Sequence, residues 1–161
     1  MLNPALDRDA LADQYRRDQR IAITNVLQED IAERVRVICS SKVPFDFAYA
    51  LEGTNRIASL QEMGALDANT KAELSKALLQ DATKGIGFLY CRYAVDHQPS
   101  ADPDLQFLQE VVEYLNSAAM LDFVKHVSGR NDIVRADAQY TRYSAGQYLT
   151  RHRDVVDGPP R

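Results

Sequence analysis

A histidine and an aspartate near the end of the chain, His152 and Asp154, have the types and the spacing of two metal ligands. On a β-strand, residues i and i+2 point to the same face, about 6.6 Å apart along the chain. Two histidines and one carboxylate are the facial ligand set that holds Fe(II) and leaves positions open for other ligands. The pair alone is weak evidence, because His-x-Asp also arises by chance, and a surface ion pair on a polar strand is the simpler interpretation.

The other histidines and the cysteines show no ligand spacing. We expect His97 to be solvated in a loop, and His126 to lie near a helix C-terminus, where a positive side chain suits the helix dipole. Cys39 and Cys91 stand among apolar neighbours, without the spacing of a zinc site. Buried, unpaired thiols are therefore expected rather than a disulfide.

The residues that precede the histidine extend the pattern. Tyr143, Gly146, His152 and Asp154 resemble the entry to the metal site of prolyl-hydroxylase-like 2-oxoglutarate oxygenases. That family has a strand ending in Tyr, a Gly three residues later, and His-x-Asp beginning six residues after the Gly. Gly146 also suits a tight turn, which favours a residue that tolerates positive φ. The resemblance is specific over residues 132–161, where 157–161 resemble the loop after the motif, and it is looser before.

The resemblance implies site residues and cofactors. His152 and Asp154 would bind Fe(II), with 2-oxoglutarate as co-substrate and ascorbate as an optional addition. Tyr143 would line the site near metal and substrate, in a catalytic and a cofactor-binding role. The family tyrosine that hydrogen-bonds 2-oxoglutarate stands three residues before the histidine, where this chain has Leu149. Tyr148 shares a face with His152 on an unbulged strand, so it is the candidate replacement.

This sequence lacks two features that the family has. The family's second metal histidine and its basic 2-oxoglutarate clamp come from strands far downstream, beyond the stretch that these 161 residues cover. Arg151 and Arg153 are expected to face away from the metal. We therefore expect the N-terminal part of a dioxygenase, without turnover by these 161 residues alone. Unpaired edges of its strands would favour self-association.

The hydrophobic periodicity predicts a mixed α+β chain. We expect helices over the first ~20 residues, from Glu29 and Asp30, from Asp67 to Gly85, from Asp102-Pro103, and through Leu121 and Val124 to Gly129. We expect strands at 20–27, 45–51 with one wet face, near 57–60, 88–93, 132–143 and 147–154.

These elements predict one domain over residues 1–161, composed of two parts. Residues 1–130 would be a helix-rich part that braces a distorted double-stranded β-helix, or jelly roll, whose first strands lie in 131–161. Composition is that of a globular protein, with 45% hydrophobic and 26% charged residues. No apolar run suits a membrane helix and no signal peptide is evident, so we expect a cytoplasmic chain without a membrane partner. The scattered basic residues and net charge of −4 disfavour a nucleic-acid partner.

The function expected from the resemblance is Fe(II)- and 2-oxoglutarate-dependent oxidation. Its leading substrate is a prolyl residue in a protein or peptide, and a free amino acid or small molecule is the alternative substrate. A non-catalytic fragment or protein-binding module of the same fold is the alternative function. A histidine downstream of Arg161, followed by Arg or Lys, would separate the enzyme from the module.

Overall fold

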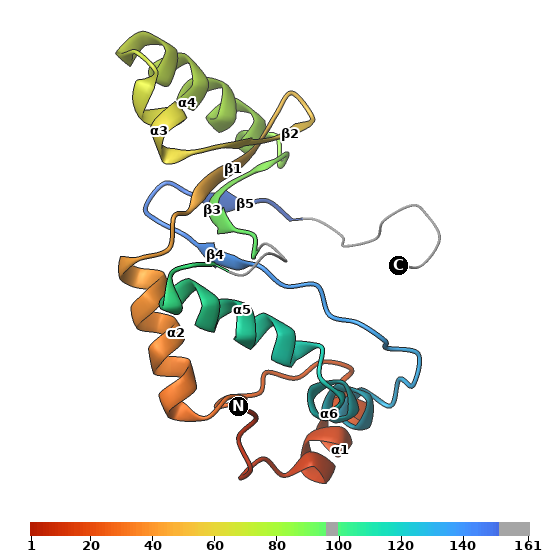
Figure 1. Cartoon of the computed structure of the whole chain (residues 1–161). Coiled ribbons are helices and arrows are strands. Elements are labelled where there is room, and N and C mark those ends of the chain that lie inside the picture. Colours follow the sequence, from red (N-terminus) through yellow and green to blue (C-terminus); the bar gives the residue numbers. More distant parts are fainter. Residues whose placement is uncertain (96–99, 152–161) are drawn as a thin grey trace. The chain divides into compact units, whose positions relative to one another are not determined.

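The computed structural model describes residues 1–95 and 100–151, which form a mixed α+β structure (Figure 1). Its elements, in chain order, are α1 (Arg8–Asp18), α2 (Glu29–Ser41), β1 (Asp46–Leu51), β2 (Thr54–Ala58), α3 (Leu60–Ala65), α4 (Ala68–Thr83), β3 (Phe88–Tyr93), α5 (Pro103–Leu115), α6 (Ala118–Ser128), β4 (Tyr140–Arg142) and β5 (Tyr148–Leu149). Among the described residues, no helix combines the length and apolar character needed to cross a bilayer.

The chain divides into two compact units. The first, here called the helical unit, comprises Met1–Val43 and Ala94–Tyr140. The second, here called the sheet unit, comprises Pro44–Tyr93 and Thr141–Arg161. Each unit is therefore built from two separate stretches of chain.

In the helical unit, α1 and α6 lie side by side around a small apolar core (Figure 1). Met120, Phe123 and Val127 of α6 are buried at helical spacing, and Leu11 and Tyr15 of α1 pack against them. Both ends of α6 are capped, because Ser117 accepts from the Met120 backbone N–H and Gly129 ends the helix in a left-handed conformation. The expected end of this helix near Gly129 is confirmed.

The segment predicted as a strand at 20–27 is irregular instead. Asn25 has φ +54°, which an extended strand cannot accommodate, and the segment has only an isolated bridge, between Leu2 and Leu27. Its backbone pairs with the chain start, through hydrogen bonds from Asn3 N to Val26 O and from Gln28 N to Met1 O. The β-branched composition predicted a ladder, but the local backbone conformation prevents one.

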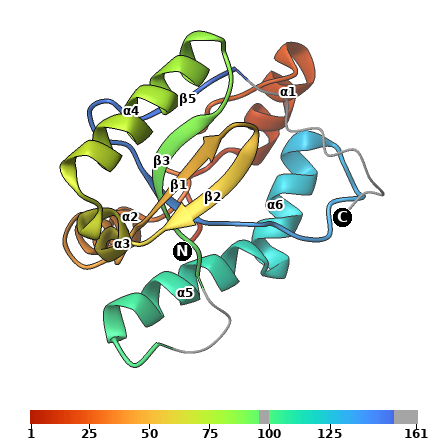
Figure 2. The same ribbon diagram turned by 90° about the horizontal axis from the view of Figure 1, so that it is seen from above.

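In the sheet unit, the described residues form a five-stranded sheet of order β2-β1-β3-β4, with β5 also paired to β3. The pairings of β1 with β2, β1 with β3 and β3 with β5 are antiparallel. Glu52 and Gly53 join β1 to β2 with φ of +53° and +74°, the double positive φ of a type I′ hairpin turn. Figure 2 shows this hairpin next to β3.

The pairing register defines the two faces of this sheet. Tyr49, Leu89 and Tyr148 stand opposite one another across β1, β3 and β5, so they share one face. We call it the covered face, because the hydroxyl of Tyr148 donates to the Leu78 carbonyl of α4 there. Ala48 and Tyr90 are opposite one another on the other face, which we call the aromatic face.

The expectation that residues 45–51 have one wet face is wrong. Ala48, Tyr49 and Ala50 are consecutive and all buried, so β1 is covered on both sides. On the aromatic face the cause is local, because the cross-strand partner of Ala48 is the large side chain of Tyr90. A small side chain is thus covered by a large neighbour on that face.

Within residues 1–95 and 100–151, the last two strands are shorter than expected. The prediction of extended chain over 132–143 and 147–154 is met by the three residues of β4 and the two residues of β5. Both pair with β3, and the intervening turn carries Gly146 at φ +85°. The mixed α+β class is confirmed, and the jelly-roll core remains a prediction.

Candidate active site

The two expected metal ligands, His152 and Asp154, lie outside the described residues, as does His97. Within residues 1–95 and 100–151, no group of three His, Cys, Asp or Glu side chains is placed to hold a metal ion. What the structure describes is the approach to the expected metal pair, from β4 through the turn at Gly146 to Arg151.

Tyr143 follows directly on β4 and lies on the aromatic face. Its ring packs on Tyr90 with centroids 5.5 Å apart and a tilt of 30°, and the residue is 49% exposed. In the described part of the chain its hydroxyl has no hydrogen-bond partner. The Tyr143 side chain is therefore positioned by its ring contact, and its hydroxyl is available to donate a hydrogen bond to a ligand.

Tyr148 is used differently, although it is only five residues further on. Its hydroxyl donates to the carbonyl oxygen of Leu78 at 2.8 Å, which ties β5 to α4 on the covered face. Burial, together with the nearby carboxylate of Asp81, raises the pKa of this hydroxyl. The phenol therefore stays protonated at neutral pH, and its O–H already donates a hydrogen bond within the protein.

The turn between these tyrosines explains their opposite directions. Gln147 N donates to the Ser144 carbonyl at 2.9 Å, and the Gln147 side chain accepts from Ser144 N at 2.8 Å. The same side chain donates to the sulfur of buried Cys91 at 3.2 Å. Gly146 has a backbone conformation in the left-handed region and completes this turn. This agrees with its expected role as a tight-turn residue.

The expected alternation from Tyr148 to His152 can be followed only as far as Arg151, because His152 lies outside the described residues. It assumed an unbulged strand from 147 to 154, whereas regular pairing covers only Tyr148 and Leu149. Thr150 then bonds to the Gly87 carbonyl through both its backbone N–H and its hydroxyl, and Arg151 lies in a bend. Period two holds along a regular strand and not through a bend.

Sequence reasoning missed three residues of β3 that lie on the same face as Tyr143. Phe88, Tyr90 and Arg92 alternate along the strand, so they project on the aromatic face. The Phe88 and Tyr90 ring centroids are 5.3 Å apart. The alternation was visible in the sequence, but only the register with β1 and the contact with Tyr143 connect it to the candidate site.

The third histidine and the two cysteines lie outside the candidate site or serve the fold. Nε2 of His126 lies 2.8 Å from a carboxylate oxygen of Asp9, so this histidine joins α6 to the start of α1. Cys39 and Cys91 are free thiols, as expected, and Cys91 is buried, whereas Cys39 is only half-buried. These observations leave the tyrosines and Arg92 as the groups of chemical interest in the described sheet unit.

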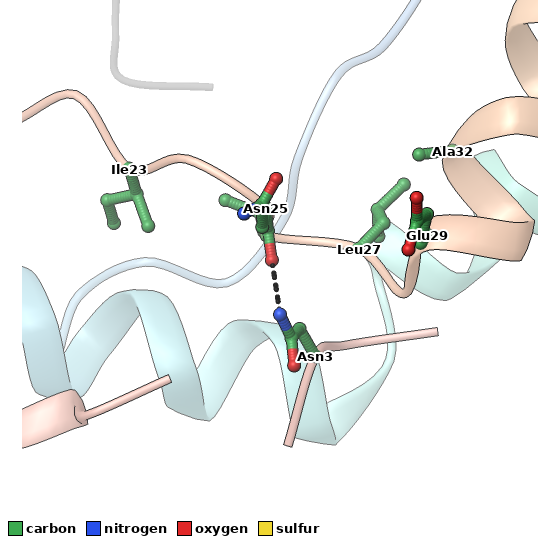
Figure 3. Close-up of a pocket in the computed structure, with 7 residues that line it drawn as sticks. Asn3, Ile23, Asn25, Leu27, Glu29 and Ala32 are labelled. Atoms are coloured by element: carbon green, nitrogen blue, oxygen red, sulfur yellow. Dashed lines mark hydrogen bonds between the residues drawn. The ribbon is translucent and has the colours of Figure 1, made fainter. Parts of the chain in front are cut away.

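The helical unit contains a cavity of about 560 Å³ beside the N-terminus of α2 (Figure 3). In it the Asn3 side chain donates to the backbone carbonyl of Asn25 at 3.0 Å. The lining residues are Asn3, Ile23, Asn25, Val26, Leu27, Glu29 and Ala32. Glu29 supplies the one carboxylate of this lining, which contains no histidine or cysteine.

Comparison with protein-family models, with curated proteins and with solved structures found no match to this chain.

Proposed function

We propose that this chain belongs to an Fe(II)- and 2-oxoglutarate-dependent dioxygenase of the prolyl-hydroxylase-like kind. The proposed enzyme acts in the cytoplasm on a prolyl residue of a protein, and its core is a distorted jelly roll. The observation that carries the proposal is the spacing of Tyr143, Gly146, His152 and Asp154. The positive φ of Gly146 supports it, because this is the turn conformation that the pattern requires.

In this proposal His152 and Asp154 hold the iron. Bound iron and 2-oxoglutarate supply the activation of O₂, and the protein positions the reactants. Tyr143 is favoured over Tyr148 as the hydrogen-bond donor to 2-oxoglutarate, because the Tyr148 proton is donated to Leu78. The aromatic rings beside Tyr143 provide an apolar wall against which a pyrrolidine ring can pack.

The metal site is tested by binding of Mn(II), which replaces Fe(II) without oxidising. We expect Asp154→Ala and His152→Ala to remove most of the Mn(II) binding measured by titration calorimetry or electron paramagnetic resonance. Asp157→Ala is the matched control, since it removes a carboxylate three residues from Asp154 and should change binding little. Equal losses from Asp154→Ala and Asp157→Ala would contradict a specific site.

The reaction is tested by succinate release. A protein that contains the whole domain, incubated with Fe(II), 2-oxoglutarate and a proline-containing peptide, should yield succinate together with hydroxylated peptide, and Asp154→Ala should abolish both. The 161 residues alone should yield neither. Metal binding by the whole domain without succinate or hydroxylation would contradict the enzyme and favour the alternative, a binding module of the same fold.

A further inference from the structure

Strand β2 lies at an edge of the sheet. Within the described residues it pairs with β1 alone and stands at one end of the order β2-β1-β3-β4 (Figure 2). Its residues from Thr54 to Ile57 are exposed, and Ala58 is half-buried. Ser59 then caps α3. The side of β2 that faces away from β1, here called the outer edge, is therefore an open strand between a hairpin turn and a helix.

The hairpin turn decides which backbone groups point to the outer edge. A two-residue turn at Glu52 and Gly53 makes its flanking residues, Leu51 and Thr54, a hydrogen-bonded pair. Such pairs alternate along an antiparallel ladder, so the backbone groups of Asn55 and Ile57 point away from β1. In the described part of the chain, neither residue has a backbone hydrogen bond outside the ladder. Unpaired N–H and C=O groups of this kind can pair with a further strand.

Two side chains of β2 give the outer edge its selectivity. Arg56 is exposed and has no ion-pair partner in the described structure. A residue opposite Arg56 on an added strand would be in a non-hydrogen-bonded pair, where the side chains are closest. An acidic side chain there would pair with the guanidinium. Ile57, which is 58% exposed, lies on the other face of the sheet and would contact an apolar neighbour.

The same arginine disfavours a second copy of this chain as the added strand. In the two-fold antiparallel pairing that uses the whole of β2, Arg56 would stand opposite the same arginine of the second copy. Like charges directly opposite one another destabilise a strand pair. Charge complementarity therefore favours a different chain, with an acidic residue at that position.

We propose that the outer edge of β2 binds an extended, acidic segment of a partner protein as an added antiparallel strand. Asn55 and Ile57 hydrogen-bond to its backbone, and Arg56 pairs with its carboxylate. Because the added strand is antiparallel, the residue that contacts Ile57 comes directly before the acidic residue. This docking surface is independent of the proposed iron site, since it uses neither the metal pair nor Tyr143.

The test is titration of the full chain with the capped peptide Ser-Thr-Val-Glu-Thr-Val-Ser, followed by amide hydrogen exchange in NMR spectra. Exchange should slow at the amides of Asn55 and Ile57. The amides of Thr54 and Arg56, which already belong to the ladder with β1, should change little.

Two N-methylated peptides test the backbone pairing without altering the protein. Methylation of the valine before the glutamate removes the N–H that donates to Ile57, and it should weaken binding by about tenfold or more. Methylation of the glutamate itself is the matched control, because that N–H points away from β2. Binding of both methylated peptides with equal affinity would overturn the proposal.

Charge-reversal variants test the selectivity. Arg56→Glu should weaken binding of the glutamate peptide by about threefold or more, because an opposite-charge pair becomes a like-charge pair. The same variant should prefer a peptide with lysine in place of glutamate. Lys76→Glu is the control, since it makes the same charge change at an exposed position of α4. Circular dichroism first compares each variant with the parent.

The proposal is overturned if the glutamate peptide, up to its solubility limit, leaves exchange at Asn55 and Ile57 unchanged. Equal effects of Arg56→Glu and Lys76→Glu would also overturn it. Exchange at these two amides that slows with rising protein concentration and without peptide would show that a second copy occupies the outer edge instead.

Discussion

At the scale of the residue, two tyrosines five positions apart have different surroundings. The Tyr143 ring packs on Tyr90 with a free hydroxyl in the described part of the chain, whereas the Tyr148 hydroxyl donates to Leu78. Both tyrosines were candidates from the sequence. The turn at Gly146 decides between them, because it places Tyr143 on the aromatic face and Tyr148 on the covered face.

Removing each hydroxyl should therefore have a different effect. Tyr148→Phe loses a half-buried hydrogen bond and should lower the free energy of unfolding by about 1 kcal/mol. Tyr143→Phe should leave stability nearly unchanged and, in a protein that contains the whole domain, raise the 2-oxoglutarate requirement of succinate release. Chemical denaturation and an activity titration measure the two effects. A 2-oxoglutarate requirement raised by Tyr148→Phe and unaffected by Tyr143→Phe would reverse the assignment.

Gly146 gives a second residue-scale prediction. It has φ +85°, and a Cβ at this position would meet open space, so Gly146→Ala introduces backbone strain without a clash. We expect a loss of about 1–2 kcal/mol in the free energy of unfolding. The matched control is Gly64→Ala, which lies in α3 with open space and no positive φ, and should stabilise by about 0.5–1 kcal/mol. If Gly146→Ala and Gly64→Ala shifted the midpoint of thermal denaturation in the same direction, the turn geometry would be contradicted.

At the scale of the element, α2 and α5 are joined by a cluster of charges. Asp104 at the start of α5 pairs with Lys42, and more distantly with Arg34 at 3.7 Å. The Arg34 guanidinium also stacks over Phe107 at 3.8 Å from the ring centroid. The hydrogen bond from Lys42, with a smaller contribution from Arg34, lowers the pKa of the Asp104 carboxyl.

The lowered pKa sets the sign of a pH dependence. A carboxyl with a lowered pKa in the folded state stabilises the fold above its ordinary pKa, and this contribution is lost as the pH falls below about 4. Asp104→Asn should thus be less stable than the parent at neutral pH, with a difference that shrinks toward zero in acid. Glu110→Gln, which removes an exposed carboxylate of the same helix, is the control. A difference that grows in acid, measured by urea unfolding, would contradict the ion pair.

The accuracy of sequence-based prediction at this scale follows from local signals. Asp67, Asp102 and Gly129 mark helix boundaries that the structure contains, because caps act on the nearest turn. The prediction of a strand at residues 20–27 was wrong. The β-branched residues there indicate strand propensity, but a strand also needs a pairing partner and a compatible φ, and Asn25 has a positive φ. For the candidate site, Tyr143 was found from the motif. Arg92 was not, because its neighbours are set by strand register.

At the scale of the whole molecule, each unit is assembled from stretches distant in the sequence. Local patterns cannot predict this, because the pairing of β3 with β5 depends on contacts between residues about 60 positions apart. In the described residues β1, β2 and β3, all before residue 131, form most of the sheet. Short β4 and β5 add to it next to β3.

This division predicts how metal binding affects stability. The expected ligands follow β5 in the chain, so bound Mn(II) should stabilise the sheet unit selectively. At 100 times its dissociation constant, a ligand adds about 2.7 kcal/mol to the stability of the body that it binds. Hydrogen exchange should therefore slow at the amides of β1 and β3, with little change in α1 and α6.

The comparison variant for this experiment is Asp154→Ala, which should show no slowing at β1 and β3 at the same Mn(II) concentration. Slowing restricted to α1 and α6 would place the metal near His126 and Asp9, which already approach one another at 2.8 Å. Equal slowing in both units would mean that they unfold together. Selective slowing in the sheet unit, lost in the variant, is the result expected, because only that unit is continuous in the chain with the expected ligands.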